Sequence, residues 1–272
     1  MVGRLTRLSA LNRWIAPLRL GTFLGIWVLV WLPLGLPLLG IIDDPNDRSI
    51  ILLGLAYGEF LILLWAWGRW VGQRSSPLGH YGLIPCRNLL TRLSWGWLLG
   101  TGAVFGIYLL QTPWGWVSWH LPQADFLRIT LEGFGVALGV GLAEESLFRG
   151  WMFTELRQDY GQRSALGFSS GLFAALHFIK PWPEIWRTLP QFPGLVLLAL
   201  ILGTVRTENL GACIGIHGGL VWGYYLLKVG HLVSLNDRVS PWITGVDGNP
   251  LAGLVGLAIL ALWWGISRQA KP

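Results

Sequence analysis

Long runs of apolar residues, separated by short polar segments, constrain the fold of this chain more than any other feature. A membrane-spanning helix needs about 20 mostly apolar residues. Charged residues make up 12% of the chain, whereas soluble domains have about 25%, so a soluble globule is not expected. The runs predict an all-α polytopic membrane bundle with about eight spans, near residues 22–41, 50–68, 94–110, 133–153, 164–180, 191–205, 210–229 and 250–267.

The basic residues predict how the bundle is oriented. Thirteen of the 20 Lys and Arg residues lie in the termini and in every second loop, whereas six lie in the alternate loops. Because Lys and Arg accumulate in cytoplasmic loops, this distribution places both termini in the cytoplasm. The formal net charge of +6 then lies beside anionic lipid, so the bilayer is the expected partner and nucleic acid is not.

The chain is expected to form one integral membrane domain over residues 1–272, because neither repeats nor linkers interrupt it. The first apolar run is long and lacks a small-residue cleavage site, which indicates a retained helix rather than a signal peptide. Cys86 and Cys213 lie in unrelated segments, so neither a disulfide framework nor a cysteine-rich metal site is expected. The segment near 230–249 predicts a folded external loop.

Ionisable side chains inside the apolar runs are the functional candidates, because a charge in the bilayer core costs about 2.5 kcal/mol or more. The densest group is Glu144-Glu145, followed by Arg149, in the fourth span. Glu145 and Arg149 are four residues apart on one helix face, which predicts an ion pair. Glu144 projects about 100° away from Glu145. It has no partner on its own helix and is therefore the candidate general base.

Two histidines in later spans are the expected partners of Glu144. His177 follows Phe173 by one helical turn. His217 lies opposite a stripe of three glycines, at positions 211, 215 and 219, which predicts close approach of another helix. Their positions along the spans place these groups in one mid-membrane layer. The other in-span carboxylates, expected to be paired or near an interface, are those of Glu59 and Glu132.

These motifs resemble those of the CPBP (CAAX protease and bacteriocin-processing, also called Abi) intramembrane proteases, which include the type II CAAX prenyl endopeptidases. The family pattern is Glu-Glu-x-x-x-Arg, then Phe-x-x-x-His, then His-x-x-x-Asn/Asp. The resemblance covers about residues 130–230, and the eight-span layout is also similar. The matching positions are Glu144-Glu145 to Arg149, Phe173 to His177, and His217 to Val221.

The resemblance implies an endopeptidase that hydrolyses a peptide bond of a membrane-associated protein or peptide. It implies that Glu144 and His177 position and deprotonate a water and that His217 stabilises the oxyanion. Glu145 and Arg149 would orient the site. Val221 departs from the family pattern and cannot donate a hydrogen bond. Loss of one oxyanion donor typically costs about 10²–10³ in rate.

Whether the site holds a metal is left open by the residue types. Two histidines and a carboxylate, His177, His217 and Glu144, can bind Zn²⁺ in an open catalytic site. The family carries a metalloprotease label. A metal-free, glutamate-activated water is equally compatible with these residues. No other cofactor is expected, and the hydroxyls of Ser146, Ser169 and Ser170 are interpreted as helix-packing groups.

Two other functions are compatible with the same residues. Buried carboxylates and histidines also build the proton relays of proton-coupled transporters. A catalytically impaired scaffold of the same fold is the other alternative, and Val221 is its main argument. The compact chain predicts a bacterial plasma or internal membrane, where peptide maturation or membrane-protein processing is expected rather than cleavage of prenylated substrates.

Overall fold

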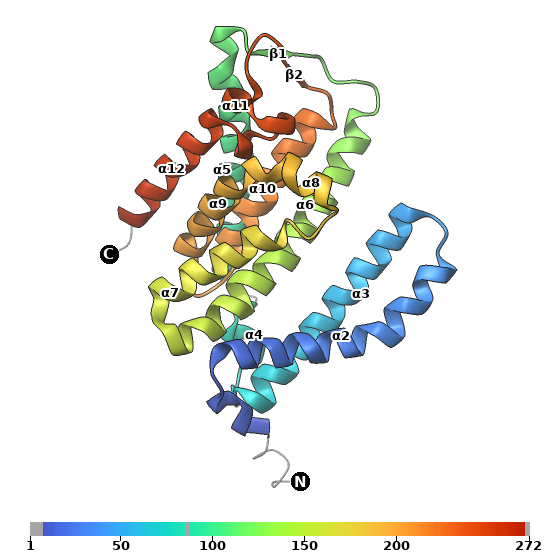
Figure 1. Cartoon of the computed structure of the whole chain (residues 1–272), viewed down its shortest axis with the longest axis vertical. Coiled ribbons are helices and arrows are strands. Elements are labelled where there is room, and N and C mark those ends of the chain that lie inside the picture. Colours follow the sequence, from blue (N-terminus) through green and yellow to red (C-terminus); the bar gives the residue numbers. More distant parts are fainter. Residues whose placement is uncertain (1–7, 85–86, 270–272) are drawn as a thin grey trace.

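The computed structural model describes residues 8–84 and 87–269, and it is built almost entirely of helices (Figure 1). The expected all-α bundle is confirmed, and Cys86 lies outside the described residues. The long helices are α2 (Ala16–Ile41), α3 (Pro45–Ala66), α5 (Arg87–Gln111), α6 (Phe126–Glu145), α7 (Phe153–Leu176), α9 (Phe192–Val205), α10 (Gly211–Lys228) and α12 (Leu254–Gln269).

Short elements connect these helices. The segment expected to be a folded loop contains a strand, β2, that pairs antiparallel with β1, with Val117 opposite Leu235. This pairing was not predicted, because each strand has only three residues. The short elements are η1 (Ala10–Arg13), η2 (Trp67–Val71), α4 (Pro77–His80), η3 (Thr112–Trp114), β1 (Val117–Trp119), η4 (Ser146–Met152), α8 (Trp182–Thr188), η5 (Leu189–Gln191), β2 (Val233–Leu235), α11 (Pro241–Thr244), η6 (Val246–Gly248) and η7 (Pro250–Ala252).

Among the described residues, five helical stretches are long and apolar enough to cross a membrane. The longest, Phe126–Leu176, comprises α6, η4 and α7. Gly161 has a φ of 72° inside it, and the chain reverses direction there, so this stretch contains two of the expected spans (Figure 1). The expected number of eight is not confirmed. α12 has only 16 residues, and α10 is also not among the five, since its glycines and His217 lower its hydropathy.

α5 and α10 pack with their backbones in close contact. The expected glycine stripe of α10 faces α5, and a Cβ atom on Gly215 would collide with the carbonyl oxygen of Leu93. Gly96 of α5 likewise lies against the carbonyl oxygen of Ala212. Such contact holds α10 firmly because no side chain separates the two helices. His217 projects from the other side of α10, toward α6.

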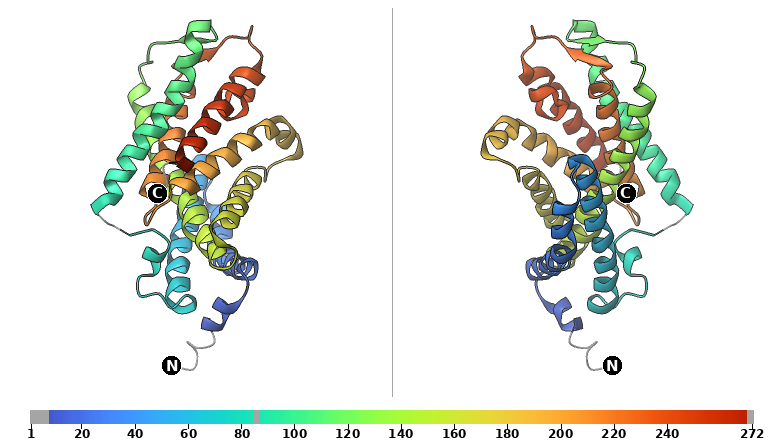
Figure 2. Two further views of the ribbon diagram at one scale, coloured as in Figure 1. Left: turned by 90° about the vertical axis from the view of Figure 1, so that its left-hand side faces the viewer. Right: turned by 90° about the vertical axis from the view of Figure 1, so that its right-hand side faces the viewer.

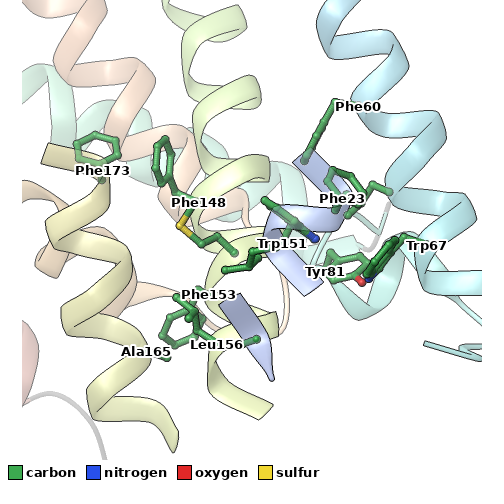
Figure 3. Packing of buried hydrophobic residues seen from close by; sticks show 14 of the residues in the cluster. Phe23, Phe60, Trp67, Tyr81, Phe148, Trp151, Phe153, Leu156, Ala165 and Phe173 are labelled. Atoms are coloured by element: carbon green, nitrogen blue, oxygen red, sulfur yellow. The ribbon is translucent and has the colours of Figure 1, made fainter. Parts of the chain in front are cut away.

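An aromatic cluster joins α2 and α3 to η4 (Figure 3). The ring of Trp151, which is fully buried, lies 4.4 Å from that of Phe23 and 6.4 Å from that of Phe60, measured between centroids. Phe23 and Phe60 meet edge to face at 5.8 Å, an arrangement that aromatic rings favour. Because Trp151 lies two residues after Arg149, this cluster anchors the segment that carries the Glu-Glu-x-x-x-Arg motif.

A buried ion pair connects the start of α2 to α7. The Nε atom of Arg19 lies 2.8 Å from Oε2 of Glu155, and both residues are 2% exposed. Arg19 also donates to the carbonyl oxygen of Glu155, and the hydroxyl of Tyr81 donates to Oε1 of the same side chain at 2.9 Å. In the sequence, Arg19 is only one of several basic residues before the first apolar run, so this role was not predicted.

Replacing Arg19 by Met is expected to lower the free energy of unfolding by about 3–5 kcal/mol, because Glu155 then stays buried without its cation. Unfolding of the purified protein in detergent measures this loss. Arg13→Met is the control, since Arg13 is exposed. The double variant Arg19→Met/Glu155→Leu should recover part of the loss. Equal stability of Arg19→Met and Arg13→Met would contradict a stabilising role for the pair.

Candidate active site

The Glu-Glu-x-x-x-Arg motif lies where α6 continues into η4, which is a π-helix. The Oγ atom of Ser146 donates to the carbonyl oxygen of Leu142 at 2.6 Å, and the amide of Phe153 donates to Phe148, five residues back. A serine hydroxyl on the carbonyl four residues back disturbs the regular helix at that point. The sequence predicted a regular span over residues 133–153, so the π-helix is a correction. Such turns are frequent at functional sites.

Glu145 is the buried centre of the site. Its side chain is 0% exposed, and Oε1 accepts hydrogen bonds from Nη1 of Arg149 and from Nδ1 of His217, each at 2.8 Å. The predicted pair of Glu145 and Arg149 is therefore confirmed. The contact with His217 was not predicted, because it depends on how α10 is rotated against α6, and sequence spacing within one helix carries no information about that rotation.

Glu144 lies on another side of the same helix and is 31% exposed. Its Oε2 atom lies 3.9 Å from Nε2 of His177 and 3.9 Å from Nε2 of His217. The predicted convergence of these three side chains is confirmed. These distances are longer than hydrogen bonds, and Oε2 of Glu144 has no hydrogen-bond partner among the described residues. A water about 2.8 Å from each of the three atoms would join them.

The tautomer of each histidine follows from its hydrogen-bond partner. Nδ1 of His177 lies 2.7 Å from the carbonyl oxygen of Phe173, and Nδ1 of His217 lies 2.8 Å from a carboxylate oxygen of Glu145. Both oxygens can only accept, so both Nδ1 atoms carry a proton. In a neutral ring, Nε2 then has the free lone pair. Both histidines therefore present Nε2 to Glu144.

The ring of Phe173 contacts the guanidinium of Arg149 and the imidazoles of His177 and His217. Its ring is fully buried, and its centroid lies 4.6 Å from that of His177 and 6.0 Å from that of His217. The guanidinium carbon of Arg149 lies 4.4 Å from the same ring, as in a cation–π contact. The contacts explain why a phenylalanine one turn before His177 suits this site. From the sequence, Phe173 was recognised only as part of a motif.

A cavity of about 200 Å³ borders both histidines. Because a water occupies about 30 Å³, the cavity has room for several waters or for a substrate side chain. Val221 also lines it, as do the side chains of Tyr224 and Asn249. Asn249 precedes α12, at the end of the segment that was predicted only as a folded external loop. No spacing within the sequence motifs indicated it. The remaining lining is mostly apolar and comes from α5, α9 and α12.

The other polar residues considered from the sequence lie elsewhere. Glu132 pairs with Arg128 at 3.0 Å, as expected. Both carboxylate oxygens of Glu59 are buried and have no hydrogen-bond partner in the described part of the chain, so of the two expectations, pairing or a place near an interface, pairing is not met. Neither Glu59 nor Glu132 touches the two histidines.

Two serines of α7, Ser169 and Ser170, are buried in the helix bundle. Residues 167–171 have the Gly-x-Ser-x-Gly spacing of serine hydrolases, but that nucleophile sits on a strand-to-helix turn. Here the five residues lie inside α7. Ser169 is buried and its hydroxyl donates to the carbonyl oxygen of Leu166 at 3.3 Å, and Ser170 is buried as well. These contacts support their interpretation as helix-packing groups.

Zinc binding is predicted from the donor set alone. Two imidazole nitrogens and a carboxylate, from His177, His217 and Glu144, are ligands that zinc accepts. Yet no group of three or more His, Cys, Asp or Glu side chains within residues 8–84 and 87–269 has the arrangement of a metal site. Zinc therefore stays a prediction from the residue types, and the chemistry proposed below uses the protein's own groups.

The two adjacent glutamates are expected to differ in their effect on stability. Glu145→Leu leaves the buried Arg149 without its anion and should lower the free energy of unfolding by about 3–5 kcal/mol. Glu144→Gln removes no hydrogen bond made within the described residues and should change it by less than about 0.5 kcal/mol. Thermal or denaturant unfolding in detergent compares the two variants. Equal losses would show that Glu145 is not the structural anchor of the pair.

The family model "Type II CAAX prenyl endopeptidase Rce1-like" matches residues 126–223. No curated protein and no solved structure matches the chain. The matched segment runs from the start of α6 into α10 and contains all five predicted site residues. Over residues 126–223 the chain is thus similar to the Rce1-like family of type II CAAX prenyl endopeptidases, and the predicted resemblance to these membrane proteases is confirmed.

Proposed function

We propose that this protein is an intramembrane endopeptidase that cleaves a membrane-associated protein or peptide with a glutamate-activated water. One observation carries the proposal: Oε2 of Glu144 lies 3.9 Å from Nε2 of both His177 and His217. The three side chains come from the end of α6, the end of α7 and the middle of α10. Groups brought together from three separate elements, two of them lining a cavity, support a reaction centre rather than a local helix contact.

The attack step uses Glu144 and His177. The water loses a proton to the carboxylate of Glu144 while its oxygen bonds to the carbonyl carbon of the scissile peptide. Nε2 of His177, which has a lone pair in the neutral ring, accepts a hydrogen bond from the second water proton and orients the attack. The protonated Glu144 then gives its proton to the leaving nitrogen, the C–N bond breaks, and a carboxyl group and an amine are released.

The charges of the site favour His217 as the group that stabilises the oxyanion. Glu144 and Glu145 carry two negative charges when ionised, whereas Arg149 carries one positive charge. Nδ1–H of His217 is held by Glu145 at 2.8 Å, so the other ring nitrogen, Nε2, lies on the side of Glu144. The role of oxyanion donor requires a proton on Nε2 as well, and that proton would balance the second carboxylate. A fixed N–H donor of this kind stabilises charge that develops on the carbonyl oxygen.

Asn249 is proposed to replace the donor that Val221 lacks. Both side chains line the cavity beside His217. The Oδ1 atom of Asn249 accepts the amide of Leu251 at 2.9 Å, and Nδ2 makes no hydrogen bond within the described residues. The carboxamide is thus held by its oxygen, and its two N–H donors are free for a substrate. Donors fixed before the reaction stabilise an oxyanion without reorganisation.

The mostly apolar lining supports a substrate with an apolar side chain near the scissile bond. A bacterial plasma or internal membrane is proposed as the location, with peptide maturation or membrane-protein processing as the role. In that setting, cleavage of prenylated substrates is the less favoured reaction, although the matching family bears that name.

Glu144→Gln is expected to lower the cleavage rate by about 10²–10⁴, because the amide cannot act as the general base. Proteomic comparison of cells that carry the wild-type protein or the variant should show uncleaved membrane proteins accumulating with the variant. Glu132→Gln, on the same helix but exposed, is the matched control.

A proteome that is identical for Glu144→Gln and the wild type would contradict the protease and favour the impaired scaffold. Loss of proton-coupled transport instead of cleavage would favour the transporter. Metal analysis of the purified protein, together with a chelator, decides between a zinc site and a metal-free water.

Asn249→Asp keeps the oxygen that accepts the amide of Leu251 but removes the N–H donors, so kcat is expected to fall by about 10²–10³. Val221→Asn, which supplies a donor at the family position, is expected to restore part of this loss in the double variant. Cleavage of an identified substrate, with the thermal stability of each variant, provides the measurement. An unchanged kcat in Asn249→Asp would rule out this donor.

A further inference from the structure

A second cavity, of about 500 Å³, lies apart from the candidate active site. It shares no lining residue with the cavity beside the histidines. Its walls come from α4, from α7 around the turn at Gly161, and from the end of α9 with the segment after it. α4 and the turn of α7 lie at the end of the molecule opposite the two strands (Figures 1 and 2). The distribution of Lys and Arg predicts that this end faces the cytoplasm.

Two arginines line this second cavity, and neither has a carboxylate partner among the residues that the structure describes. The guanidinium carbons of Arg157 and Arg206 lie 5.8 Å and 5.3 Å from the ring centroid of Phe153, so one aromatic side chain supports both cations. Nη2 of Arg206 donates to the hydroxyl of Thr154 at 3.0 Å. Its Nε atom is buried and has no hydrogen-bond partner within the described residues, and neither arginine forms an ion pair there. Only one lining residue is acidic, Glu208.

Further basic residues surround the cavity. His80 lines it, and burial, followed by the positive charges of Arg74, Arg157 and Arg206, lowers the pKa of His80 to about 4. Arg92 of α5 donates a hydrogen bond to the hydroxyl of Thr207, which is also part of the wall. Basic residues from three loops that are far apart in the sequence thus lie around this one cavity. The sequence predicted these loops only as basic cytoplasmic segments.

We propose that this cavity binds a phosphate-bearing ligand. A guanidinium group presents several N–H donors in a plane and pairs well with phosphate oxygens. Arg157 and Arg206 can approach one phosphate from α7 and from the segment after α9, and the carboxamide of Gln162 adds a neutral donor. The ligand is either the headgroup of an anionic lipid in the cytoplasmic leaflet or a small soluble phosphate, which present the same group to the two arginines.

The test is a titration of the purified full-length protein in detergent with three probes: short-chain phosphatidylglycerol, inorganic phosphate, and short-chain phosphatidylcholine as the control without net charge. A ligand that binds only the folded state raises the unfolding temperature with its concentration. Stabilisation by phosphatidylglycerol alone identifies a lipid site, and stabilisation by inorganic phosphate identifies a site for small phosphates. Stabilisation by neither, or equally by phosphatidylcholine, would overturn the proposal.

Variants locate the binding. Arg157→Gln, at an exposed position, and Arg157→Gln/Arg206→Gln are each expected to weaken the apparent affinity at least tenfold. Arg163→Gln is the matched control, because Arg163 is exposed near the same turn but does not line the cavity. Equal weakening by Arg157→Gln and Arg163→Gln would reduce the effect to general surface charge and refute the site. Glu144→Gln should bind the probe like the wild type, so this result does not depend on the proposed protease activity.

Discussion

The shared carboxylate of Glu145 is the interaction on which the candidate site depends. A buried carboxylate is tolerated when it is paired and hydrogen-bonded, and becomes very costly when its partners are removed. Here one oxygen, Oε1, receives a guanidinium from its own helix and an imidazole from α10. Because both donors bind the same fully buried atom, α6 and α10 have one favourable relative rotation. That rotation directs Nε2 of His217 toward Glu144.

Packing on both sides maintains this rotation. α10 is in backbone contact with α5 through glycines such as Gly215, whose missing Cβ leaves space for the Leu93 carbonyl. On the other side, the fully buried Trp151 fixes η4 against the rings of α2 and α3. Close-packed interiors transmit small shifts rather than absorb them. The two helices that bring Glu145 and His217 together are therefore each held by an independent contact.

Local features of this site were predictable from the sequence, whereas contacts between elements were only partly so. The pair of Glu145 and Arg149 follows from helical spacing alone. The motifs, together with their positions along the spans, predicted that Glu144 lies near His177 and His217. The π-helix depends on a hydroxyl competing for one carbonyl, which hydropathy does not reveal. The contact of Glu145 with His217 and the place of Asn249 depend on helix rotation and on a loop fold, for which one sequence has no periodic signal.

The unequal burial of the two adjacent glutamates explains why the site has both. Neighbouring positions on a helix project about 100° apart, so one carboxylate can be enclosed while the next is partly exposed. Glu145 is 0% exposed and has two donors, whereas Glu144 is 31% exposed and has two imidazoles 3.9 Å away. The division between an anchoring carboxylate and the carboxylate proposed to react therefore follows from the turn of the helix, and Arg149 forms its ion pair with the first of the two.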